Sequence, residues 1–360
     1  MEIERRLGEA WYSAPVTMSS PASVRPSDRL DRPLEDLRVS VTDRCNFRCG
    51  FCMPADRRYE FLPRPEVLTF EEIERLVGLF VDLGVRKVRL TGGEPLLRAD
   101  IETLVRKVAS VPGVDDLALT TNGWLLGEKA RVLQEAGLDR VTVSLHSLDR
   151  EVFARSNGLG LPLHRVLAGI EAARAAGLDP VKLNAVITRG ENEHEIVDLA
   201  RYAREHGCVI RFIEYMDVGT INSWDAERVV SAQQIIERID AVYALEPLDK
   251  EFRGEVAARW RYRDGGGEIG VIPSITQPFC GDCTRARLTA DGRLFTCLFG
   301  AIGHDLKGPL RRGEDDEALH RRIAAIWSAR TDRYSEERTE ALRAGRFEAA
   351  PKVEMFRIGG

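Results

Sequence analysis

Residues 37–54 read LRVSVTDRCNFRCGFCMP, a β-rich run followed at once by three cysteines. The run Leu37–Val41 predicts a strand. Cys45, Cys49 and Cys52 then form a CxxxCxxC pattern in the loop after that strand. The chain has seven cysteines, six of them in two groups of three, and this pattern argues against a disulfide framework. We therefore expect the two groups to bind metal.

The order of strand, loop and helix recurs through the middle of the chain. The predicted strands are Leu37–Val41, Lys87–Thr91, Leu117–Thr121, Val141–Leu145, Val181–Thr188 and Val209–Tyr215. The predicted helices are Phe70–Leu83, Ile101–Ser110, Lys129–Gly137, Leu163–Gly177, Glu193–Gly207 and Ser231–Ile239. Repeats of this kind predict parallel strands joined by right-handed crossovers.

Two α/β architectures fit this pattern, an open partial barrel and a doubly wound sheet. Polar segments follow the strands at residues 42–45, 91–94, 120–123 and 214–216, and Ser144 ends another strand. Barrel enzymes place their chemistry at the C-terminal ends of the strands. We therefore predict a partial, TIM-like (β/α)6 barrel over residues 32–245.

The pattern changes after Ala244, where a turn at Gly265–Gly267 leads to an irregular segment that holds the second cysteine group. Two polar helices are predicted near residues 314–329 and 336–344. We predict that residues 246–360 form a smaller domain that covers the open end of the barrel.

The composition is that of a globular protein of 360 residues, 44% hydrophobic and 30% charged, which excludes a disordered or fibrous chain. A net charge of −5 gives no support for broad nucleic-acid binding. No stretch of 18 uninterrupted apolar residues predicts a membrane helix. Residues 1–31 lack the apolar core of a signal peptide, so we predict a flexible leader and a cytoplasmic protein.

The second cysteine group consists of Cys280 and Cys283 in a CxxC pattern, with Cys297 further on. Structural zinc usually takes four protein ligands, and four-iron clusters usually take four thiolates. Three thiolates leave one metal position open to a non-protein ligand. A zinc site completed by a histidine and a zinc-ribbon fragment remain as alternatives. The seventh cysteine, Cys208, is predicted to be a small buried apolar residue.

The first cysteine group, with Met53-Pro54 after it and Thr91-Gly-Gly-Glu-Pro95 after the next strand, resembles the radical S-adenosylmethionine (SAM) superfamily. The resemblance implies a 4Fe-4S cluster on Cys45, Cys49 and Cys52, whose fourth iron binds SAM. Gly92 and Gly93 allow backbone groups to approach the ligand closely, and Glu94 can accept hydrogen bonds from its ammonium group.

From about residue 37 to residue 360 the chain resembles one family in particular, the GTP 3′,8-cyclases of molybdenum cofactor biosynthesis. The resemblance rests on the second cysteine group, Arg285-Ala286-Arg287, residues 289–292 and the C-terminal Ile358-Gly-Gly360. It implies a second 4Fe-4S cluster on Cys280, Cys283 and Cys297, whose open iron binds the guanine of GTP. The smaller domain is then an iron–sulfur domain.

The resemblance also assigns roles to single residues. GTP contacts fall on Arg38, Arg89, Thr120, Lys182, Arg285, Ala286 and Arg287, and SAM contacts fall on Phe51, Gly93, Glu94, Ser144 and Met216. Arg285 and Arg287 count as catalytic together with the first three cysteines, and the tail Gly359-Gly360 is implied to enter the active site. The alternatives are surface cations for the arginines and Lys182, core packing for Met216 and a frayed tail. His146 stands where the family often has an acid, and it receives no role.

The implied reaction converts GTP to (8S)-3′,8-cyclo-7,8-dihydroguanosine 5′-triphosphate through a 5′-deoxyadenosyl radical. The implied partners are GTP, an electron donor and the next enzyme, cyclic pyranopterin monophosphate synthase, with no nucleic acid and no membrane. A homodimer is one of the assemblies left open. The rival functions are a two-cluster electron carrier and a peptide-modifying radical SAM enzyme. Arg285-Ala286-Arg287 and the Gly-Gly end favour the cyclase.

Overall fold

The computed structural model describes residues 25–347 and 351–359. The predicted leader, residues 1–31, lies outside the described residues as far as residue 24. None of the described helices has both the length and the apolar character needed to cross a membrane.

Six parallel strands, paired in chain order, form the centre of the molecule. They are β1 (Asp36–Ser40), β2 (Lys87–Thr91), β3 (Asp116–Thr121), β4 (Arg140–Ser144), β5 (Lys182–Ile187) and β6 (Val209–Glu214). The helices between them are α1 (Phe70–Asp82), α2 (Ile101–Ala109), α3 (Leu126–Glu135), α4 (Arg150–Ser156), α5 (His164–Ala175) and α6 (Ile196–Glu205), and α7 (Ala232–Asp240) follows β6.

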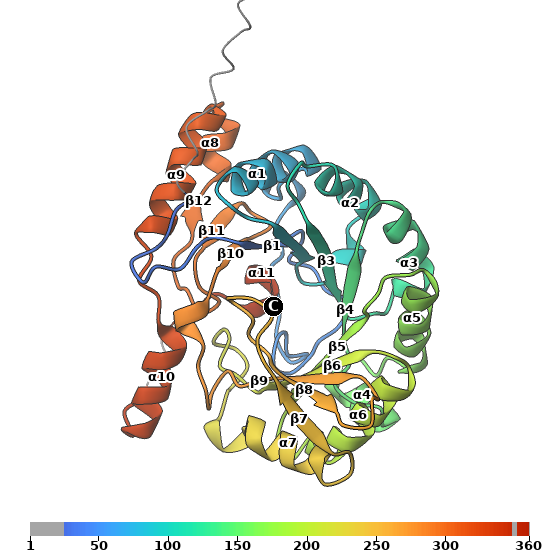
Figure 1. The fold of residues 1–360 in the computed structure, drawn as a ribbon. Helices are drawn as coiled ribbons and strands as arrows, with labels where there is room; N and C mark the ends of the chain where they lie inside the picture. The colour runs from blue at the N-terminus through green and yellow to red at the C-terminus, as the bar shows by residue number, and fades with distance from the viewer. Residues whose placement is uncertain (1–24, 348–350, 360) are drawn as a thin grey trace, which may run out of the picture.

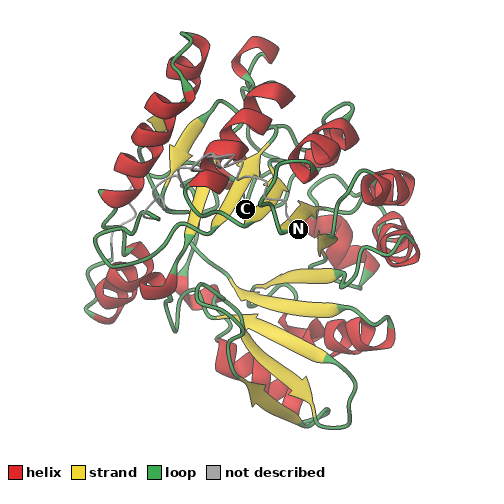
Figure 2. Ribbon diagram, turned by 45° about the horizontal axis from the view of Figure 1, so that its top comes forward, coloured by secondary structure: helices red, strands yellow, loops and turns green. Residues whose placement is uncertain are grey.

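The strands curve around an open centre, and the helices cover the outside of this ring (Figure 1). Figure 2 shows the same arrangement from a second direction. A doubly wound sheet would carry helices on both of its faces. The predicted α/β partial barrel is therefore confirmed.

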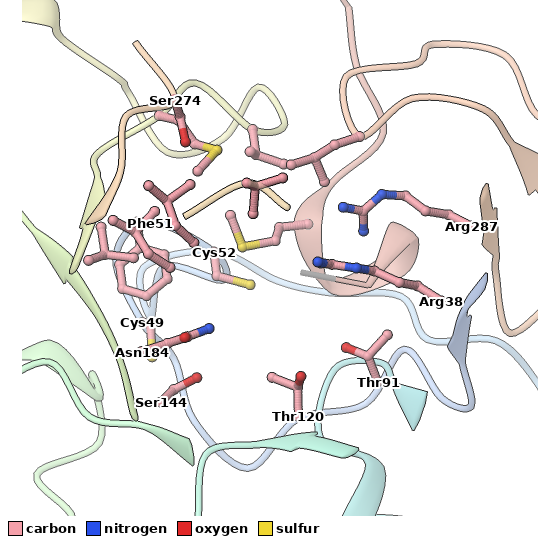
Figure 3. A pocket seen from close by; sticks show the side chains of 18 of the residues that line it. Arg38, Cys49, Phe51, Cys52, Thr91, Thr120, Ser144, Asn184, Ser274 and Arg287 are labelled. Atoms are coloured by element: carbon pink, nitrogen blue, oxygen red, sulfur yellow. The ribbon is translucent and has the colours of Figure 1, made fainter. Parts of the chain in front are cut away.

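The first helix shows how the sequence produces this arrangement. Thr69 caps α1, because its hydroxyl accepts from the Glu72 backbone N–H while the Glu72 carboxylate accepts from the Thr69 backbone N–H. The apolar stripe of the helix, which includes Ile73 and Phe80, is buried against the strands. Along β1, Leu37 and Val39 are fully buried, while Arg38 alternates with them and points to the centre of the ring (Figure 3).

The C-terminal part of the chain extends both edges of this sheet, which the sequence did not predict. β10 (Arg285–Leu288) pairs in parallel with β1, and β9 (Glu268–Ile272) pairs in parallel with β6. Beyond β10 lie β11 (Arg293–Phe295) and β12 (His304–Asp305), and beyond β9 lie β8 (Ala258–Tyr262) and β7 (Leu245–Leu248). One twelve-stranded sheet thus runs through both predicted parts, and the boundary at residue 245 stays a prediction.

The last helices are α8 (Lys307–Arg311), α9 (Asp316–Ser328), α10 (Tyr334–Arg343) and α11 (Met355–Ile358), and the short 3-10 helices are η1 (Arg64–Glu66), η2 (Pro95–Leu97), η3 (Glu193–Glu195), η4 (Ala226–Arg228) and η5 (Cys280–Asp282). α9 and α10 match the two polar helices that the sequence predicted near the C-terminus. α11 lies in the middle of the ring (Figure 1), where its Phe356 and Ile358 are buried.

Candidate active site

One cavity at the C-terminal ends of the strands is lined by all six cysteines of the two predicted groups. The cysteines are free thiols, and none of the six forms a disulfide. Two regions more than two hundred residues apart in sequence therefore meet in one space, because β10 places the second group beside β1.

The donor set fits iron–sulfur clusters better than zinc. Within residues 25–347 and 351–359, no three His, Cys, Asp or Glu side chains converge on the position of a single ion. A structural zinc ion requires such convergence. A four-iron cluster does not, because each thiolate binds a different iron.

The loop that carries the first group is held by its neighbours. Arg48 donates to the Cys45 carbonyl (2.8 Å), and the backbone N–H of Met53 donates to the Cys49 carbonyl (2.7 Å). The Asn122 amide, in the loop after β3, reaches the Cys45 sulfur (3.9 Å). Burial raises the pKa of the metal-free Cys45 thiol to about 11.

The two glycines after β2 bring two loops together. A Cβ at Gly92 would lie 2.5 Å from the Thr42 carbonyl oxygen, and one at Gly93 would lie 2.3 Å from the Arg44 carbonyl oxygen. The backbone N–H of Glu94 also donates to the Arg44 carbonyl (2.7 Å). These glycines therefore permit the segment after β2 to approach the loop that carries the first cysteine group. Gly93 also lines the cavity.

Glu94 is buried and is already engaged by the protein. Its carboxylate accepts from the Thr121 hydroxyl (2.6 Å) and from the backbone N–H groups of Leu96 (3.0 Å) and Asn122 (2.8 Å). Burial raises its pKa to about 7, although these hydrogen bonds oppose the shift. Glu94 thus ties the loops after β2 and β3 together at the cavity wall.

The remaining predicted SAM contacts, Phe51, Ser144 and Met216, line the cavity. His146 lies beside Phe51, with the two ring centres 5.0 Å apart, and its Nδ1 accepts from the Val186 N–H (3.1 Å). Burial lowers the pKa of His146 to about 4, so the ring is neutral. His146 therefore adds no positive charge to this side of the cavity at neutral pH.

The opposite side of the cavity carries buried guanidinium groups. Arg38 and Arg287 are paired neighbours on β1 and β10, and both point into the cavity (Figure 3). Arg89 donates to the hydroxyls of Thr120 (3.2 Å) and Thr142 (3.0 Å). Burial and the charge of Arg287 lower the pKa of Arg38 well below its usual value.

The sequence did not point to one further cation, Arg211 on β6, which lines the same cavity. It donates to Asn184 (3.1 Å) and Thr142 (3.2 Å), and burial together with the charge of Arg89 lowers its pKa to about 9. The signal was a lone arginine within the apolar run Val209–Ile213. Cations gathered without equal negative charge favour a polyanionic ligand. The Nε of Arg38, which is buried without a hydrogen-bond partner in the described chain, supports this.

Two predicted GTP contacts, the Ala286 backbone and Lys182, are not among the described residues that line the cavity. Ala286 is fully buried opposite Leu37, because it alternates with Arg285 and Arg287, which both line the cavity. Lys182 begins β5, outside the set of described residues that line the cavity. Both residues keep their predicted roles only as predictions.

The tail reaches the ring of strands. Arg287 donates to the Gly359 carbonyl, and a Cβ at Gly359 would lie 2.5 Å from the Cγ2 of Thr91. Gly359 is buried and has φ of +76°, a value that favours glycine. The tail is therefore packed as far as Gly359, and Gly360 lies outside the described residues.

Two loops beside the cavity anchor this tail. Lys352 donates to the Asp217 carbonyl (2.8 Å), and Glu354 accepts from the Thr220 hydroxyl (2.7 Å), both in the loop after β6. Near the first cysteine group, the ring of Phe356 packs edge-on against Tyr59, 5.5 Å from centre to centre. The tail thus bridges the loop after β6 and the segment that carries the first group.

Comparison with known proteins agrees with this site. Residues 39–203 match the Radical SAM superfamily, and residues 208–336 match Molybdenum Cofactor Synthesis C. The chain is 54% identical to the GTP 3′,8-cyclase of Acidothermus cellulolyticus, over 92% of this chain and 98% of that protein. It is 50% identical to that of Xanthomonas axonopodis pv. citri (92% and 98%) and 47% identical to that of Aquifex aeolicus (92% and 99%).

Among solved structures, the fold resembles that of Streptococcus suis SuiB bound to S-adenosylmethionine, with a TM-score of 0.57 and 15% identity over 85% of this chain and 68% of that one. At this identity the likeness concerns the fold alone. The relatives at about half identity, matched almost end to end, define the family. The chain belongs to the GTP 3′,8-cyclase family of radical SAM enzymes.

Proposed function

We infer that this protein is a radical SAM enzyme that converts GTP to (8S)-3′,8-cyclo-7,8-dihydroguanosine 5′-triphosphate in molybdenum cofactor biosynthesis. The observation that carries this function is the single cavity lined by both cysteine groups and by buried arginines. A two-cluster electron carrier binds no anionic substrate, so it does not require several arginines beside its clusters. The family membership of the chain excludes the peptide-modifying rival.

We propose that Cys45, Cys49 and Cys52 hold one 4Fe-4S cluster and that Cys280, Cys283 and Cys297 hold the other. When bound, the clusters and SAM supply the electron transfer and the radical that start the reaction. Phe51, Gly93, Ser144 and Met216 line the SAM end of the cavity, and Glu94 positions the loops around it.

The cationic side of the cavity is proposed to bind GTP. Arg38, Arg89, Arg285 and Arg287, with Thr120, face the space where a triphosphate would neutralise their charges. We add Arg211 to this set because it lines the same cavity. Charge held at fixed positions orients the substrate without reorganisation.

Apolar side chains complete the wall and exclude water. They include Phe47, Phe153, Ile213, Leu298 and Phe299, which line the same cavity as the two cysteine groups. A carbon radical that meets solvent is lost, so a water-poor cavity protects the reaction. The tail that packs against Arg287 and Thr91 closes the same space.

We propose further that an external electron donor reduces the protein and that cyclic pyranopterin monophosphate synthase receives the product. Free cysteines of this number persist in a reducing compartment, which supports the cytoplasm. The homodimer remains a prediction.

Anaerobic turnover tests the function. The reconstituted protein, supplied with GTP, SAM and a reductant, should release methionine, 5′-deoxyadenosine and the cyclised nucleotide, identified by mass spectrometry. SAM cleavage that consumes no GTP under any of these conditions would contradict the proposal.

The two arginines of β10 give a direct test of GTP binding. Replacing Arg285 or Arg287 by alanine removes one charge-assisted contact, so GTP should bind roughly 10- to 150-fold more weakly by calorimetry. Iron content should stay unchanged. Arg131→Ala, at an arginine 88% exposed on α3, is the matched control. Equal GTP affinity in all three variants would show that Arg285 and Arg287 do not contact the substrate.

Replacing Lys182 tests two things separately, namely the effect of its charge on the stability of the fold and its contact with GTP. Burial and then the charge of Arg211 lower its pKa from 10.5 to about 8, so the protonated lysine destabilises the fold at neutral pH. Lys182→Met should raise Tm at pH 7, and this gain should shrink as pH rises from about 8 to 10.5, where the unfolded lysine also loses its proton.

In the same variant GTP should bind roughly 10-fold more weakly, because a triphosphate loses one cation. Lys129→Met, on α3 outside the ring, is the control and should change neither quantity appreciably. Unchanged GTP affinity in Lys182→Met would remove this lysine from the substrate site.

A further inference from the structure

We propose that Asp28, Arg32 and Arg330 form a positioning network that holds the second cysteine group in the geometry its cluster requires. The proposal rests on the assignment of a cluster to Cys280, Cys283 and Cys297. It makes the segment before β1, most of which was expected to be a loose leader, a part of that cluster site.

Arg32 connects the beginning of the chain to the first of these cysteines. Its side chain is fully buried, and its Nη1 donates to the Cys280 carbonyl (2.7 Å) and to the Asp332 carbonyl (2.8 Å). Its Nε donates to the Asp28 carboxylate (2.6 Å). One guanidinium therefore fixes a cysteine that lies 248 residues later in the sequence.

Arg330 holds the second cysteine in the same way. Its Nη1 donates to the Cys283 carbonyl (2.7 Å) and lies 3.4 Å from the same Asp28 oxygen that pairs with Arg32. Asp28 thus joins two guanidinium groups, and each of them donates a hydrogen bond to the carbonyl of one cysteine.

The third cysteine is attached through its neighbour in sequence. The hydroxyl of Thr296, just before Cys297, donates to the Asp332 carboxylate (2.6 Å), and Arg330 lies 3.3 Å from that carboxylate. All three cysteine segments therefore meet in one set of ion pairs and hydrogen bonds.

The side chains of Asp28, Arg32 and Arg330 are buried, and that of Asp332 is 33% exposed. Two arginines and two aspartates compensate one another, and removing one member leaves an uncompensated charge inside the protein. Backbone contacts add to this, since the Trp327 indole donates to the Arg32 carbonyl (3.0 Å) and the Arg29 N–H donates to the Arg330 carbonyl (3.2 Å).

Regular secondary structure does little of this positioning. Cys280 begins the three-residue η5, Cys283 follows it, and Cys297 lies in a turn after β11. A site with three protein ligands depends strongly on the shell that orients them. The first group is held by a different residue, Arg48, so the two sites should respond separately.

Iron binding in a chain that retains only the second cluster tests the network. In a Cys45/Cys49/Cys52→Ala background, the reconstituted chain should hold about four irons. Adding Arg32→Met should lower this at least fourfold, whereas Arg32→Lys, which keeps the charge and one donor nitrogen, should retain part of it. Arg29→Met, at an exposed arginine of the same segment, is the matched control and should keep the full content.

With all cysteines present, Arg32→Met should reduce iron from about eight to about four per chain and leave SAM cleavage intact. This arm shows that the variant folds. Should Arg32→Met not fold, Asp28→Asn keeps the shape of the network, and the reduced second cluster should then give a shifted electron paramagnetic resonance spectrum.

Full iron content and an unshifted spectrum in these variants would overturn the network. A background chain that holds no iron while Asp28 and Arg32 are intact would instead overturn the second cluster itself, and the network with it.

Discussion

A chain in which Cys45, Cys49 and Cys52 are all replaced by alanine is expected to lose SAM cleavage completely and to hold about four irons instead of about eight. The three thiols are the only cysteines on the loop after β1, and they line the cavity beside the predicted SAM contacts. Iron and labile sulfide per chain, and 5′-deoxyadenosine formed under reducing conditions, are the measurements. Cys208→Ala is the control, because Cys208 packs in the apolar core and should leave both quantities unchanged.

The reciprocal replacement of Cys280, Cys283 and Cys297 should also leave about four irons. Zinc at one equivalent in protein purified without oxygen would contradict the cluster assignment for both groups. A triple variant of the first group that still cleaves SAM would contradict the assignment for the first group.

Gly359→Ala is expected to reduce the cyclised product about 100-fold while both clusters, and GTP binding, stay largely intact. The added methyl group would lie 2.5 Å from Thr91 Cγ2, at a backbone φ of +76° that alanine rarely adopts. The tail must then withdraw, and Arg287 loses the carbonyl that it now holds. Cyclisation depends on geometry more than SAM cleavage does, so the ratio of product to cleaved SAM should fall.

Gly345→Ala is a matched control. Gly345 also has a positive φ, +62°, but a Cβ there would meet no atom within 4 Å. The backbone strain is therefore similar, and the clash is absent. Deletion of Gly359 and Gly360 should reproduce the loss of product. A truncated chain with full cyclase activity would show that the tail plays no part in catalysis.

The fold of the barrel could be predicted because its strands are buried and β-rich and each is followed by a polar segment. β2 was predicted to the residue, and β1 and β4 to within one residue at each end. The C-terminal strands could not be predicted in this way. β10 reads Arg-Ala-Arg-Leu, a polar pattern that becomes a strand only because β1 offers an open edge beside it.

In the candidate site, too, the residues that could be predicted are those marked by a local sequence pattern. The cysteine groups and the Gly-Gly-Glu segment are local patterns that a sequence displays directly. Arg211 and Arg32 act through partners far along the chain, so only the folded structure reveals them. Lys182 shows the converse, since a matching motif position did not bring its side chain to the cavity wall.

The strands that extend the sheet at both ends also govern the order in which the chain can mature. During synthesis β1 emerges long before residues 285–288, and β6 before residues 268–272, so both margins of the nascent ring stay unpaired until late. Exposed strand edges recruit strands of other chains. A newly made ring that awaits its last hundred residues is therefore the aggregation-prone stage of this protein. A fragment cut after β6 would remain at that stage permanently.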